Sequence, residues 1–274
     1  MKVWYMNGAG NDFMVIDARG LTLDFEKLAL EYCRLSGADG FMAVDYSDRA
    51  DFKLHFYNAD GSRGEMCGNG ARCICRYGFE NGLAGQTQVV ETTAGIVTGQ
   101  RISKRLYKIR LNDPTTIKLD LSVEADGVEY ACSYVELGDP GLPHAVVPYA
   151  GLKDADENAL RELGRKLRWH KAFPKGANVN FYEITGKDEI NERTLERGVE
   201  DYTNACGTGT GSLVTVLTLQ GKVSGQGVKV NMTGGQLVID VEREGSQIRD
   251  LYLTGPTNIV CKGEVTDEDL CLAK

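Results

Sequence analysis

The sequence predicts a mixed α/β (α+β) protein built from two similar halves, and three observations support this. Met66-Cys67-Gly68-Asn69-Gly70-Ala71-Arg72 has a near copy in Ala205-Cys206-Gly207-Thr208-Gly209-Thr210-Gly211. Each copy is followed by a segment with helical character and then by a strand that contains Thr and Gly. Short strand patterns fill most of the remaining chain. Repetition on this scale predicts two domains, each presenting one thiol at a helix entrance.

The first half alternates strand patterns with two helices. Alternating apolar residues predict strands, and apolar residues spaced by three and four predict helices. Gly-rich turns separate these elements, and Asn81-Gly82 ends the second helix. In chain order we expect strands at 3–6, 13–17, 41–44, 51–58, 87–93 and 95–111, and helices at 25–35 and 71–80.

The second half repeats this scheme. Leu160, Leu163 and Leu167 recur at helical spacing in a charged segment, which predicts an amphipathic helix. A turn at Gly138-Asp139-Pro140-Gly141 separates two strand regions. We expect strands within 119–134 and at 145–147, 178–184 and 191–197, and helices at 158–168 and 212–220. Asn112-Asp113-Pro114 interrupts the pattern between the halves, so we place the domain boundary after residue 114.

The composition is that of an ordinary globular protein of 274 residues, with 42% hydrophobic and 26% charged residues. Its formal charge of −8 argues against nucleic acid or an anionic membrane as a partner. There is no apolar run of about 20 residues and no signal-peptide pattern at the start, so we expect a cytoplasmic protein. The eight cysteines are then expected as reduced thiols. Cys73 and Cys75 lack the spacing of a zinc site, so no metal is expected.

The two cysteine turns suggest a specific chemistry. A Gly-rich turn that opens a helix directs backbone N–H groups and the positive end of the helix dipole at one point, which favours an anion. A thiol at that point is expected to have a lowered pKa and to act as a base. Two such sites are suited to holding one carboxylate while protons leave and arrive on opposite faces of the adjacent carbon. This task is racemisation or epimerisation.

A series of short motifs then follows in one order along nearly the whole chain. They are Gly10-Asn11-Asp12-Phe13, Phe56-Tyr57-Asn58-Ala59-Asp60-Gly61-Ser62, Cys67-Gly68-Asn69-Gly70-Ala71-Arg72, Pro143-His144, Asn178-Val179-Asn180-Phe181, Glu196-Arg197-Gly198, Cys206-Gly207-Thr208-Gly209 and Gly234-Gly235. In these motifs the chain resembles the diaminopimelate epimerase family. The resemblance implies a homodimeric isomerase of lysine and peptidoglycan biosynthesis that interconverts LL- and meso-2,6-diaminopimelate. It also implies a two-base mechanism with no pyridoxal phosphate or other cofactor and no metal.

The resemblance further implies a fold and a set of roles. Each domain would be a β-barrel-like, mostly antiparallel sheet around a central helix. The C-terminal strand would return to the first domain, giving 1–114 plus 259–274 with Cys67, and 115–258 with Cys206. The two cysteines would be the catalytic pair. The residues implied to bind substrate are Asn11, Asn58, Gly68, Asn69, Asn178, Glu196, Arg197, Gly207 and Thr208, and those implied to tune the thiol pKa are His144 and Glu196.

Other interpretations stay open for some of these residues. Glu196 and Arg197 could form a surface ion pair, and His144 and Asn180 could be structural. Leu142 stands where the family commonly has Asn, and Gly40 where some members have Gln, so a racemase of another amino acid is an alternative. Proline-racemase-like enzymes have His where this chain has Asn69, and phenazine-type isomerases lack the cysteine pair. A non-catalytic carboxylate-binding protein would need the turn amides but no thiols.

Overall fold

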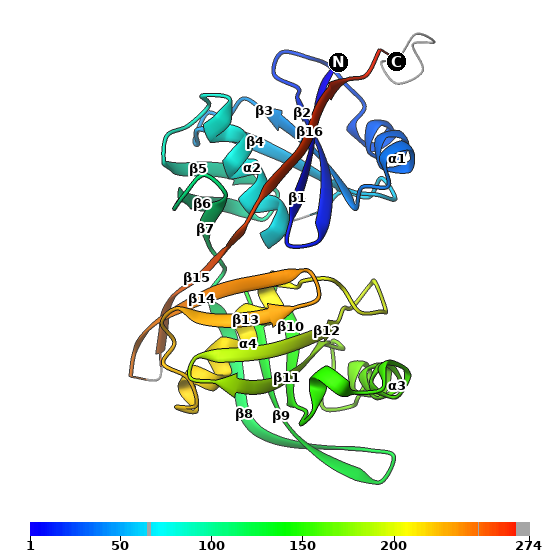
Figure 1. Cartoon of the computed structure of the whole chain (residues 1–274), viewed down its shortest axis with the longest axis vertical. Coiled ribbons are helices and arrows are strands. Elements are labelled where there is room, and N and C mark those ends of the chain that lie inside the picture. The colour runs from blue at the N-terminus through cyan, green and yellow to red at the C-terminus, as the bar shows by residue number, and fades with distance from the viewer. Residues whose placement is uncertain (65–66, 246, 267–274) are drawn as a thin grey trace. The chain divides into compact units, whose positions relative to one another are not determined.

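The computed structural model describes residues 1–64, 67–245 and 247–266. The chain divides into two compact units, Met1–Ile109 with Thr254–Lys274, and Arg110–Leu253 (Figure 1). The domain boundaries expected from the sequence, after 114 and after 258, each lie five residues later than these (114 against 109, and 258 against 253). Pro114 begins a strand at the edge of the second unit, where its missing N–H is tolerated. Residues 267–274 of the expected C-terminal segment lie outside the described residues.

The first unit is a sheet with two helices. Its strand order is β16-β1-β2-β3-β4-β5-β6-β7, with β2–β3 and β4–β5 parallel and the other adjacent pairs antiparallel. The elements are β1 (Lys2–Gly8), β2 (Asn11–Asp17), α1 (Phe25–Ser36), β3 (Gly40–Asp45), β4 (Phe52–Asn58), α2 (Gly68–Glu80), β5 (Thr87–Thr92), β6 (Gly95–Arg101), β7 (Leu106–Arg110) and β16 (Asn258–Glu264).

The second unit has the same kind of sheet, ordered β8-β9-β10-β11-β12-β13-β14-β15. Its parallel pairs are β10–β11 and β12–β13. The elements are β8 (Pro114–Ala125), β9 (Val128–Leu137), β10 (Leu142–Pro148), the 3-10 helix η1 (Leu152–Asp154), α3 (Glu157–Arg168), β11 (Asn178–Gly186), β12 (Glu189–Leu195), α4 (Gly207–Leu219), β13 (Val228–Met232), β14 (Gly235–Glu244) and β15 (Gln247–Pro256). The last strand, β15, continues into the first unit.

The two units repeat one topology. In each, an antiparallel pair leads through a helix to a parallel neighbour, α1 joining β2 to β3 and α3 joining β10 to β11. A second antiparallel pair then leads through the next helix to another parallel neighbour, α2 joining β4 to β5 and α4 joining β12 to β13. The predicted pair of similar α/β domains, each with a mostly antiparallel sheet around a helix, is therefore confirmed.

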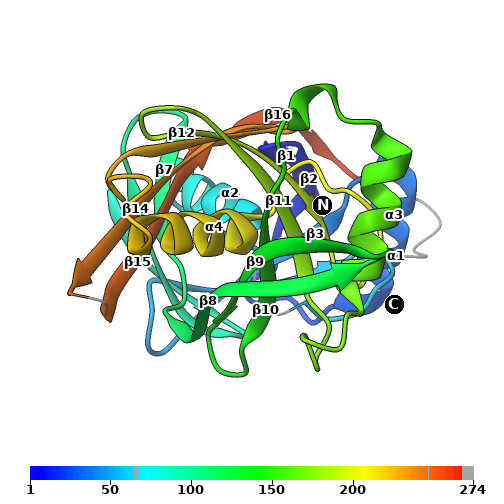
Figure 2. The same ribbon diagram turned by 90° about the horizontal axis from the view of Figure 1, so that it is seen from below.

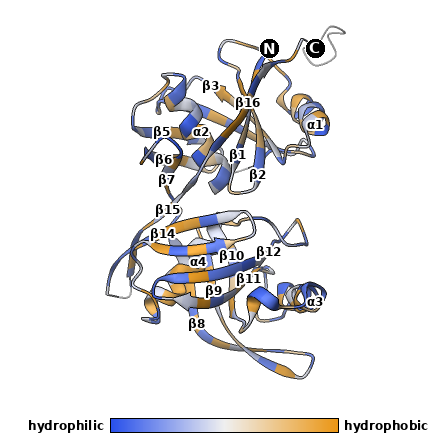
Figure 3. Ribbon diagram, in the orientation of Figure 1, coloured by the Kyte–Doolittle hydropathy of each residue, from blue (hydrophilic) through white to orange (hydrophobic). Residues whose placement is uncertain are grey.

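The second helix of each unit is the one enclosed by its sheet. The helix α2 packs against β1, β2 and β6, and α4 packs against β8, β9, β10, β11 and β14 (Figure 2). The helix α4 has strands on several sides, which is consistent with its lack of charged residues. Figure 3 colours much of it as hydrophobic. In α2, Cys73 and Cys75 are fully buried, and burial raises the pKa of each thiol to about 12. These two cysteines are core residues.

The other helix of each unit is amphipathic, and an aspartate side chain caps its N-terminus. The Asp24 carboxylate accepts from the Lys27 N–H at the start of α1, and Asp156 accepts from the Ala159 N–H at the start of α3. Gly37 ends α1 in the left-handed region, at φ +72°. Across the parts of the chain that the structure describes, no helix is both long and apolar enough to span a membrane.

Several element boundaries differ from the sequence expectations. The helices α2 and α4 begin at Gly68 and Gly207, directly after the cysteines, rather than at 71 and 212. Glycine has low helix propensity, so the sequence pattern starts each helix too late. The expected strand 95–111 is a hairpin of β6 and β7. The strand β12 ends at Leu195, so Glu196 and Arg197 lie in the turn that follows it.

Candidate active site

The first cysteine turn places Cys67 immediately before α2. Cys67 has an extended backbone (φ −116°, ψ 124°), and its carbonyl accepts the Ala71 N–H at 2.8 Å. The first N–H groups of a helix have no acceptor within the helix, so those of Gly68 and Asn69 are oriented for an anion. The end of β1 lies close behind, because a Cβ on Gly8 would lie 2.8 Å from the Asn69 carbonyl oxygen. Glycine at position 8 is what allows this approach.

Two of the predicted substrate-binding residues of this unit are in contact. The Asn69 side chain is buried, and its Nδ2 donates to Asn11 Oδ1 at 2.5 Å. Asn11 Nδ2 in turn donates to Asp39 Oδ2 at 3.3 Å. At the other end of this series of hydrogen bonds, the Arg72 guanidinium donates to Asn69 Oδ1 at 2.8 Å. Asn11 and Asn69 therefore share one hydrogen-bonded chain.

Asn58 lies elsewhere on the same sheet. It ends β4, pairs in register with Gly40 of β3, and donates from Nδ2 to Ser62 Oγ at 3.0 Å. A Cβ at Gly40 would lie 2.7 Å from Cε2 of Phe56. Position 40 is therefore restricted to glycine by the neighbouring aromatic ring. This packing explains why no glutamine stands there.

The second cysteine turn has the same backbone form. Cys206 is extended (φ −115°, ψ 102°) and precedes α4, and its carbonyl accepts the Thr210 N–H at 2.9 Å. The Gly209 N–H donates to the sulfur, and Thr208 Oγ1 lies 3.6 Å from it. A Cβ on Gly209 would collide with Asn180 Oδ1 and would lie 3.2 Å from the Cys206 sulfur. Cys206 itself is 6% exposed.

The environment of Cys206 reverses one expectation from the sequence. The helix entrance was expected to lower the thiol pKa, but burial and the charge of Glu196 raise the pKa of Cys206 well above 9.0. The hydrogen bonds from Thr208 and Gly209 act in the opposite direction and are outweighed. The thiol donates to the Glu196 carboxylate, which also accepts from Thr203 Oγ1 at 2.5 Å. Burial raises the pKa of Glu196 as well.

A second carboxyl group lies close to Cys206. Glu192 of β12 is buried, and its Oε2 lies 2.6 Å from Thr210 Oγ1, which is also 2.9 Å from the Cys206 carbonyl oxygen. Burial raises the pKa of Glu192 to about 8. Since a hydroxyl carries one hydrogen, a protonated Glu192 can donate to Thr210 while Thr210 donates to the carbonyl. Both contacts are then satisfied at neutral pH.

Asn178, Arg197 and His144 form a separate group in the second unit. Asn178 Oδ1 accepts from the Arg197 backbone N–H at 2.7 Å, and its Nδ2 donates to the Pro143 carbonyl at 3.2 Å. The Arg197 side chain is exposed, with Nη1 donating to the Lys175 carbonyl at 3.2 Å. His144 pairs in register with Asn178, and its Nδ1 lies 3.3 Å from Asn180 Nδ2. Burial lowers the pKa of His144 to about 3, and the charge of Arg197 adds to this.

The comparison with known sequences follows from these motifs. The family model described as "Diaminopimelate epimerase" matches residues 3–105 and 138–260. A diaminopimelate epimerase of Aquifex aeolicus is 36% identical over 98% of this chain and 99% of its own length. One from Caldanaerobacter subterraneus subsp. tengcongensis is 34% identical over 97% of this chain and 99% of its own length. The chain belongs to the diaminopimelate epimerase family.

Solved structures show that the family's fold is shared more widely. A Bacillus anthracis phenazine biosynthesis protein of the PhzF family superposes with a TM-score of 0.75 at 17% identity, covering 97% of this chain and 98% of its own. A probable proline racemase from Agrobacterium radiobacter K84 gives a TM-score of 0.68 at 16% identity, covering 98% of this chain and 94% of its own. At these identities the likeness establishes the fold alone.

Two residues close to the diaminopimelate epimerase motifs were given no role from the sequence. Arg72 was read only as part of the first cysteine motif, although a charged residue inside a helix of small and apolar residues is a signal of burial. Glu192 lies between Ile190 and Thr194 on the buried phase of β12, so its alternation was the available signal. Both residues lie beside the cysteine turns.

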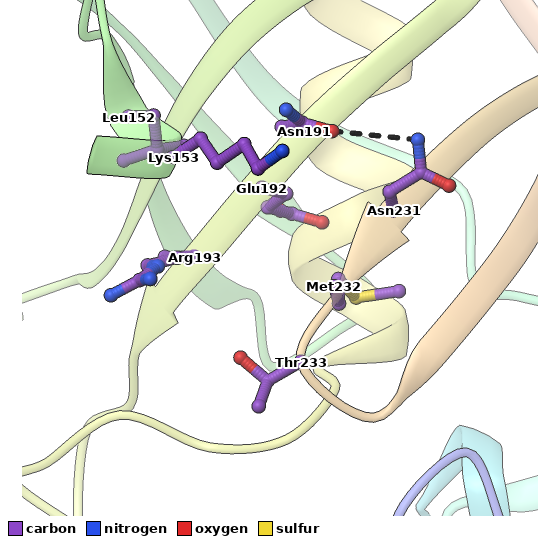
Figure 4. A pocket seen from close by; sticks show the side chains of 8 residues that line it. All are labelled: Leu152, Lys153, Asn191, Glu192, Arg193, Asn231, Met232 and Thr233. Carbon is purple, nitrogen blue, oxygen red and sulfur yellow. Dashed lines mark hydrogen bonds between the residues drawn. The ribbon is translucent and has the colours of Figure 1, made fainter. Parts of the chain in front are cut away.

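A pocket of about 330 Å³ opens beside β12 in the second unit (Figure 4). It is lined by Leu152, Lys153, Asn191, Glu192, Arg193, Asn231, Met232 and Thr233. None of the residues implied by the diaminopimelate epimerase motifs is among them. The pocket therefore does not contain the predicted site residues. It shares only Glu192 with the surroundings of the second cysteine turn.

Proposed function

We propose that the chain interconverts LL-2,6-diaminopimelate and meso-2,6-diaminopimelate by two-base proton transfer between Cys67 and Cys206. The observation that carries this is the repeated helix entrance, where each cysteine precedes a 13-residue helix with a Gly-rich first turn. The amides of Gly68 and Asn69 and those of Gly207 and Thr208 would hold the carboxylate of the reacting centre. Donors aimed there stabilise the charge that develops as the α-proton leaves.

The proposed step balances without an added reagent. One sulfur, as thiolate, forms an S–H bond with the α-proton while the Cα–H bond breaks, and the electron pair passes into the carboxylate as an enolate. The other thiol then gives its proton to the opposite face of the carbon and becomes a thiolate. Because one sulfur must be charged and the other neutral, the pair titrates as a unit and the rate is expected to follow a bell-shaped pH profile.

The remaining predicted residues would recognise the rest of the substrate. Arg197 suits the distal carboxylate because its exposed, planar guanidinium can bond both oxygens. Asn11, Asn58 and Asn178 supply amide groups, and Glu196 suits an ammonium group as well as the Cys206 thiol. His144 would act as a neutral group, because burial holds its pKa at about 3.

The direct test is proton exchange with solvent. The full chain is incubated with LL-diaminopimelate in D₂O, and the α-proton signal and the meso product are followed by NMR. We expect Cys67→Ala and Cys206→Ala each to slow epimerisation by at least about a hundredfold. Cys261→Ala, at an exposed cysteine of β16, is the matched control and should leave the rate unchanged. Full epimerisation by both active-site variants would rule out the two-thiol mechanism.

A racemase of another amino acid is the second candidate, and two positions favour it. Leu142 begins β10 without a side-chain hydrogen-bonding group, and the ring of Phe56 takes the space that a side chain at Gly40 would need. Both positions offer fewer polar contacts to a distal amino-acid group. A panel of amino acids in D₂O separates the candidates, since exchange at Cα of a substrate with no distal amino acid would favour the second.

We also propose that the protein is a cytoplasmic homodimer, as the family resemblance implies. The formal charge of −8 is in keeping with a protein that does not bind nucleic acid. Light scattering coupled to size-exclusion chromatography measures the assembly directly: a mass near twice 30.0 kDa supports the dimer, and a mass near 30.0 kDa contradicts it.

A further inference from the structure

Arg72 is a fully buried guanidinium in the first turns of α2. Its Nη1 donates to the Gly68 carbonyl at 3.1 Å, and its Nη2 donates to Asn69 Oδ1 at 2.8 Å. Its Nε has no hydrogen-bond partner, and no carboxylate of the described residues pairs with it. Burying a charge is costly, and within residues 1–64, 67–245 and 247–266 only neutral acceptors bond the Arg72 guanidinium.

Arg76, one turn further along the same helix, has the more usual surroundings of a buried arginine. It is 5% exposed, donates from Nη1 to the Thr257 carbonyl at 2.6 Å, and has Glu80 Oε1 3.8 Å from its Nε. The two arginines thus share a helix and a degree of burial. They differ in that only Arg76 has a carboxylate partner among the described residues.

The contacts of Arg72 determine how two amide side chains point. An arginine can only donate hydrogen bonds, so the Asn69 oxygen must face it and the Asn69 Nδ2 must point away. That Nδ2 donates to Asn11 Oδ1 at 2.5 Å, which leaves Asn11 Nδ2 to donate to Asp39 at 3.3 Å. A carboxylate can only accept, so the chain of donors has a defined direction at both ends. Reversal of either amide would bring two donors or two acceptors together.

The charge of Arg72 acts on few neighbours. Among the described titratable groups, Cys67 and Cys73 are those that interact with it electrostatically. Cys73 is fully buried, and burial raises its pKa to about 12, so it stays neutral. On other faces of the same helical turn, Gly8 of β1 packs against Asn69 and Cys73, and Phe13 of β2 and Met42 of β3 pack against Gly70. Cys67 directly precedes Gly68, whose carbonyl oxygen accepts from Arg72 Nη1 at 3.1 Å, so Cys67 is the described thiol whose ionisation this charge can favour.

The second unit offers a contrast at the equivalent position. Gly211 occupies the place of Arg72 in the second copy, and a Cβ there would lie 2.8 Å from Leu111 and 3.0 Å from Leu251. No cation fits at this point. The titratable groups that act on Cys206 are the carboxyls of Glu196 and Glu192, and any negative charge on them favours the neutral thiol.

We propose that Arg72 is the positioning residue of the first cysteine turn, orienting the amides of Asn69 and Asn11 and favouring the thiolate form of Cys67. It acts through these residues and does not itself touch substrate. The inference rests on the proposed function in assigning Asn11, Asn69 and Cys67 to one substrate site. Its electrostatic part, however, concerns the Cys67 sulfur alone and can be measured without turnover.

The experiment uses the full chain and compares Arg72→Met and Arg72→Lys with Arg76→Met and Arg76→Lys. The rate of Cys67 alkylation by iodoacetamide is followed from pH 5.5 to 9.5 by mass spectrometry of its peptide. We expect Arg72→Met to move the midpoint of this profile upward by at least about one pH unit, which is roughly a tenfold slower reaction below the midpoint. Arg72→Lys should restore most of the rate, and both Arg76 variants should leave the midpoint in place.

The amide part has its own measurement, KM and kcat for diaminopimelate. A lysine lacks the planar fork whose two nitrogens bond Gly68 and Asn69, so Arg72→Lys should raise KM severalfold while the alkylation profile stays near that of the parent. Asp39→Ala, at the exposed far end of the chain, should also raise KM and leave Cys67 alkylation unchanged. If Arg72→Met does not fold, these two variants still decide the amide role, and Arg72→Gln, which also removes the charge but keeps hydrogen-bond donors, decides the electrostatic role through the same Cys67 profile.

The outcomes distinguish a failure of the Arg72 proposal from a failure of the proposed epimerase function. An unchanged Cys67 profile in folded Arg72→Met overturns the electrostatic role, whether or not the enzyme epimerises diaminopimelate. An unchanged KM in both Arg72→Lys and Asp39→Ala overturns the amide role. Failure of the parent to act on any amino acid, with the Cys67 shift still present, would refute the proposed function and leave the effect of Arg72 on its thiol standing.

Discussion

Thr210 of α4 and Glu192 of β12 lie 2.6 Å apart through their side-chain oxygens, directly behind the turn that carries Cys206. Both are buried, and the second carboxyl oxygen of Glu192 has no hydrogen-bond partner among the described residues. A charged carboxylate here would be buried close to a second carboxyl, Glu196, and burial is the largest cause that raises the pKa of Glu192. The neutral acid, which donates to Thr210, suits this position better.

Glu192→Gln should therefore change how stability depends on pH. The pKa of Glu192 is raised from 4.5 to about 8 in the folded protein, so between these values the folded state holds a proton that the unfolded state has lost. Stability contributed by this group falls as pH rises through that window, by roughly 1 kcal/mol per pH unit. The glutamine side chain does not titrate and should remove this slope. Urea unfolding at pH 5, 6.5 and 8 measures it.

The control for this experiment is Glu189→Gln, on the same strand but partly exposed. It should keep the parent's slope between pH 5 and 8. If Glu192→Gln and the parent lose stability in parallel over this range, the carboxyl of Glu192 is already charged in the folded protein and the protonated arrangement is wrong.

Glu196→Gln is expected to make the Cys206 thiol more acidic. The Glu196 charge is, after burial, the largest cause that raises the pKa of Cys206, and glutamine removes the charge while keeping a hydrogen-bonding side chain. Alkylation of the Cys206 peptide should then begin at lower pH than in the parent. Thr203→Val, which removes a hydroxyl bonded to Glu196 rather than the charge, is the control and should shift the profile less. A Cys206 profile that moves upward in Glu196→Gln would contradict this account.

The sequence predicted the organisation of the fold better than the electrostatics of its sites. The cysteine motifs are local, so their repetition revealed two halves, and the strand and helix order of each half followed from periodicity. The pKa of Cys206 is raised instead by burial and then by the charge of Glu196, with a smaller effect of Glu192. Both carboxyls precede Cys206 in sequence and approach it only because β12 and its turn pack against α4. A thiol pKa predicted from the helix dipole alone does not include the effect of such neighbouring carboxyls.

The same limit explains the two residues that were missed. Within α2, Arg76 has Glu80 four residues further on, whereas Arg72 has Arg76 at that spacing, so the helix sequence offers Arg72 no carboxylate partner. Whether another element supplies one depends on packing, which the helix sequence does not show. The alternation of buried residues in 189–195 predicts that the Glu192 side chain is buried. Its hydrogen-bond partner, the hydroxyl of Thr210, lies 18 residues later and cannot be recognised from the strand pattern. Local patterns predict elements, and contacts between elements determine charge states.

Gly209→Ala should disturb the second cysteine turn. The new methyl group would collide with Asn180 Oδ1 and would lie 3.2 Å from the Cys206 sulfur, so α4 or the Asn180 amide must shift. Overpacking of this kind costs about 1–3 kcal/mol of stability, and the displaced sulfur should lower the epimerisation rate by at least about tenfold. Thermal unfolding and the D₂O assay measure the two effects. Gly85→Ala, at an exposed glycine with open space around it, should change neither.

His144 should stay neutral across the physiological range. Burial, followed by the charge of Arg197, lowers its pKa from 6.5 to about 3, and the contact with Asn180 only partly opposes this. In NMR spectra its ring signals, assigned by their loss in His144→Gln, should hold a constant shift from pH 5 to 8. A titration midpoint inside that range would show a charged His144.

Because the unfolded chain binds this proton below pH 6.5 and the folded one does not, His144 also destabilises the fold as pH falls from 6.5 toward 3. A neutral imidazole cannot lower a thiol pKa by its charge, so any influence of His144 on the second cysteine turn must pass through Asn180, which His144 contacts and which a Cβ on Gly209 would strike.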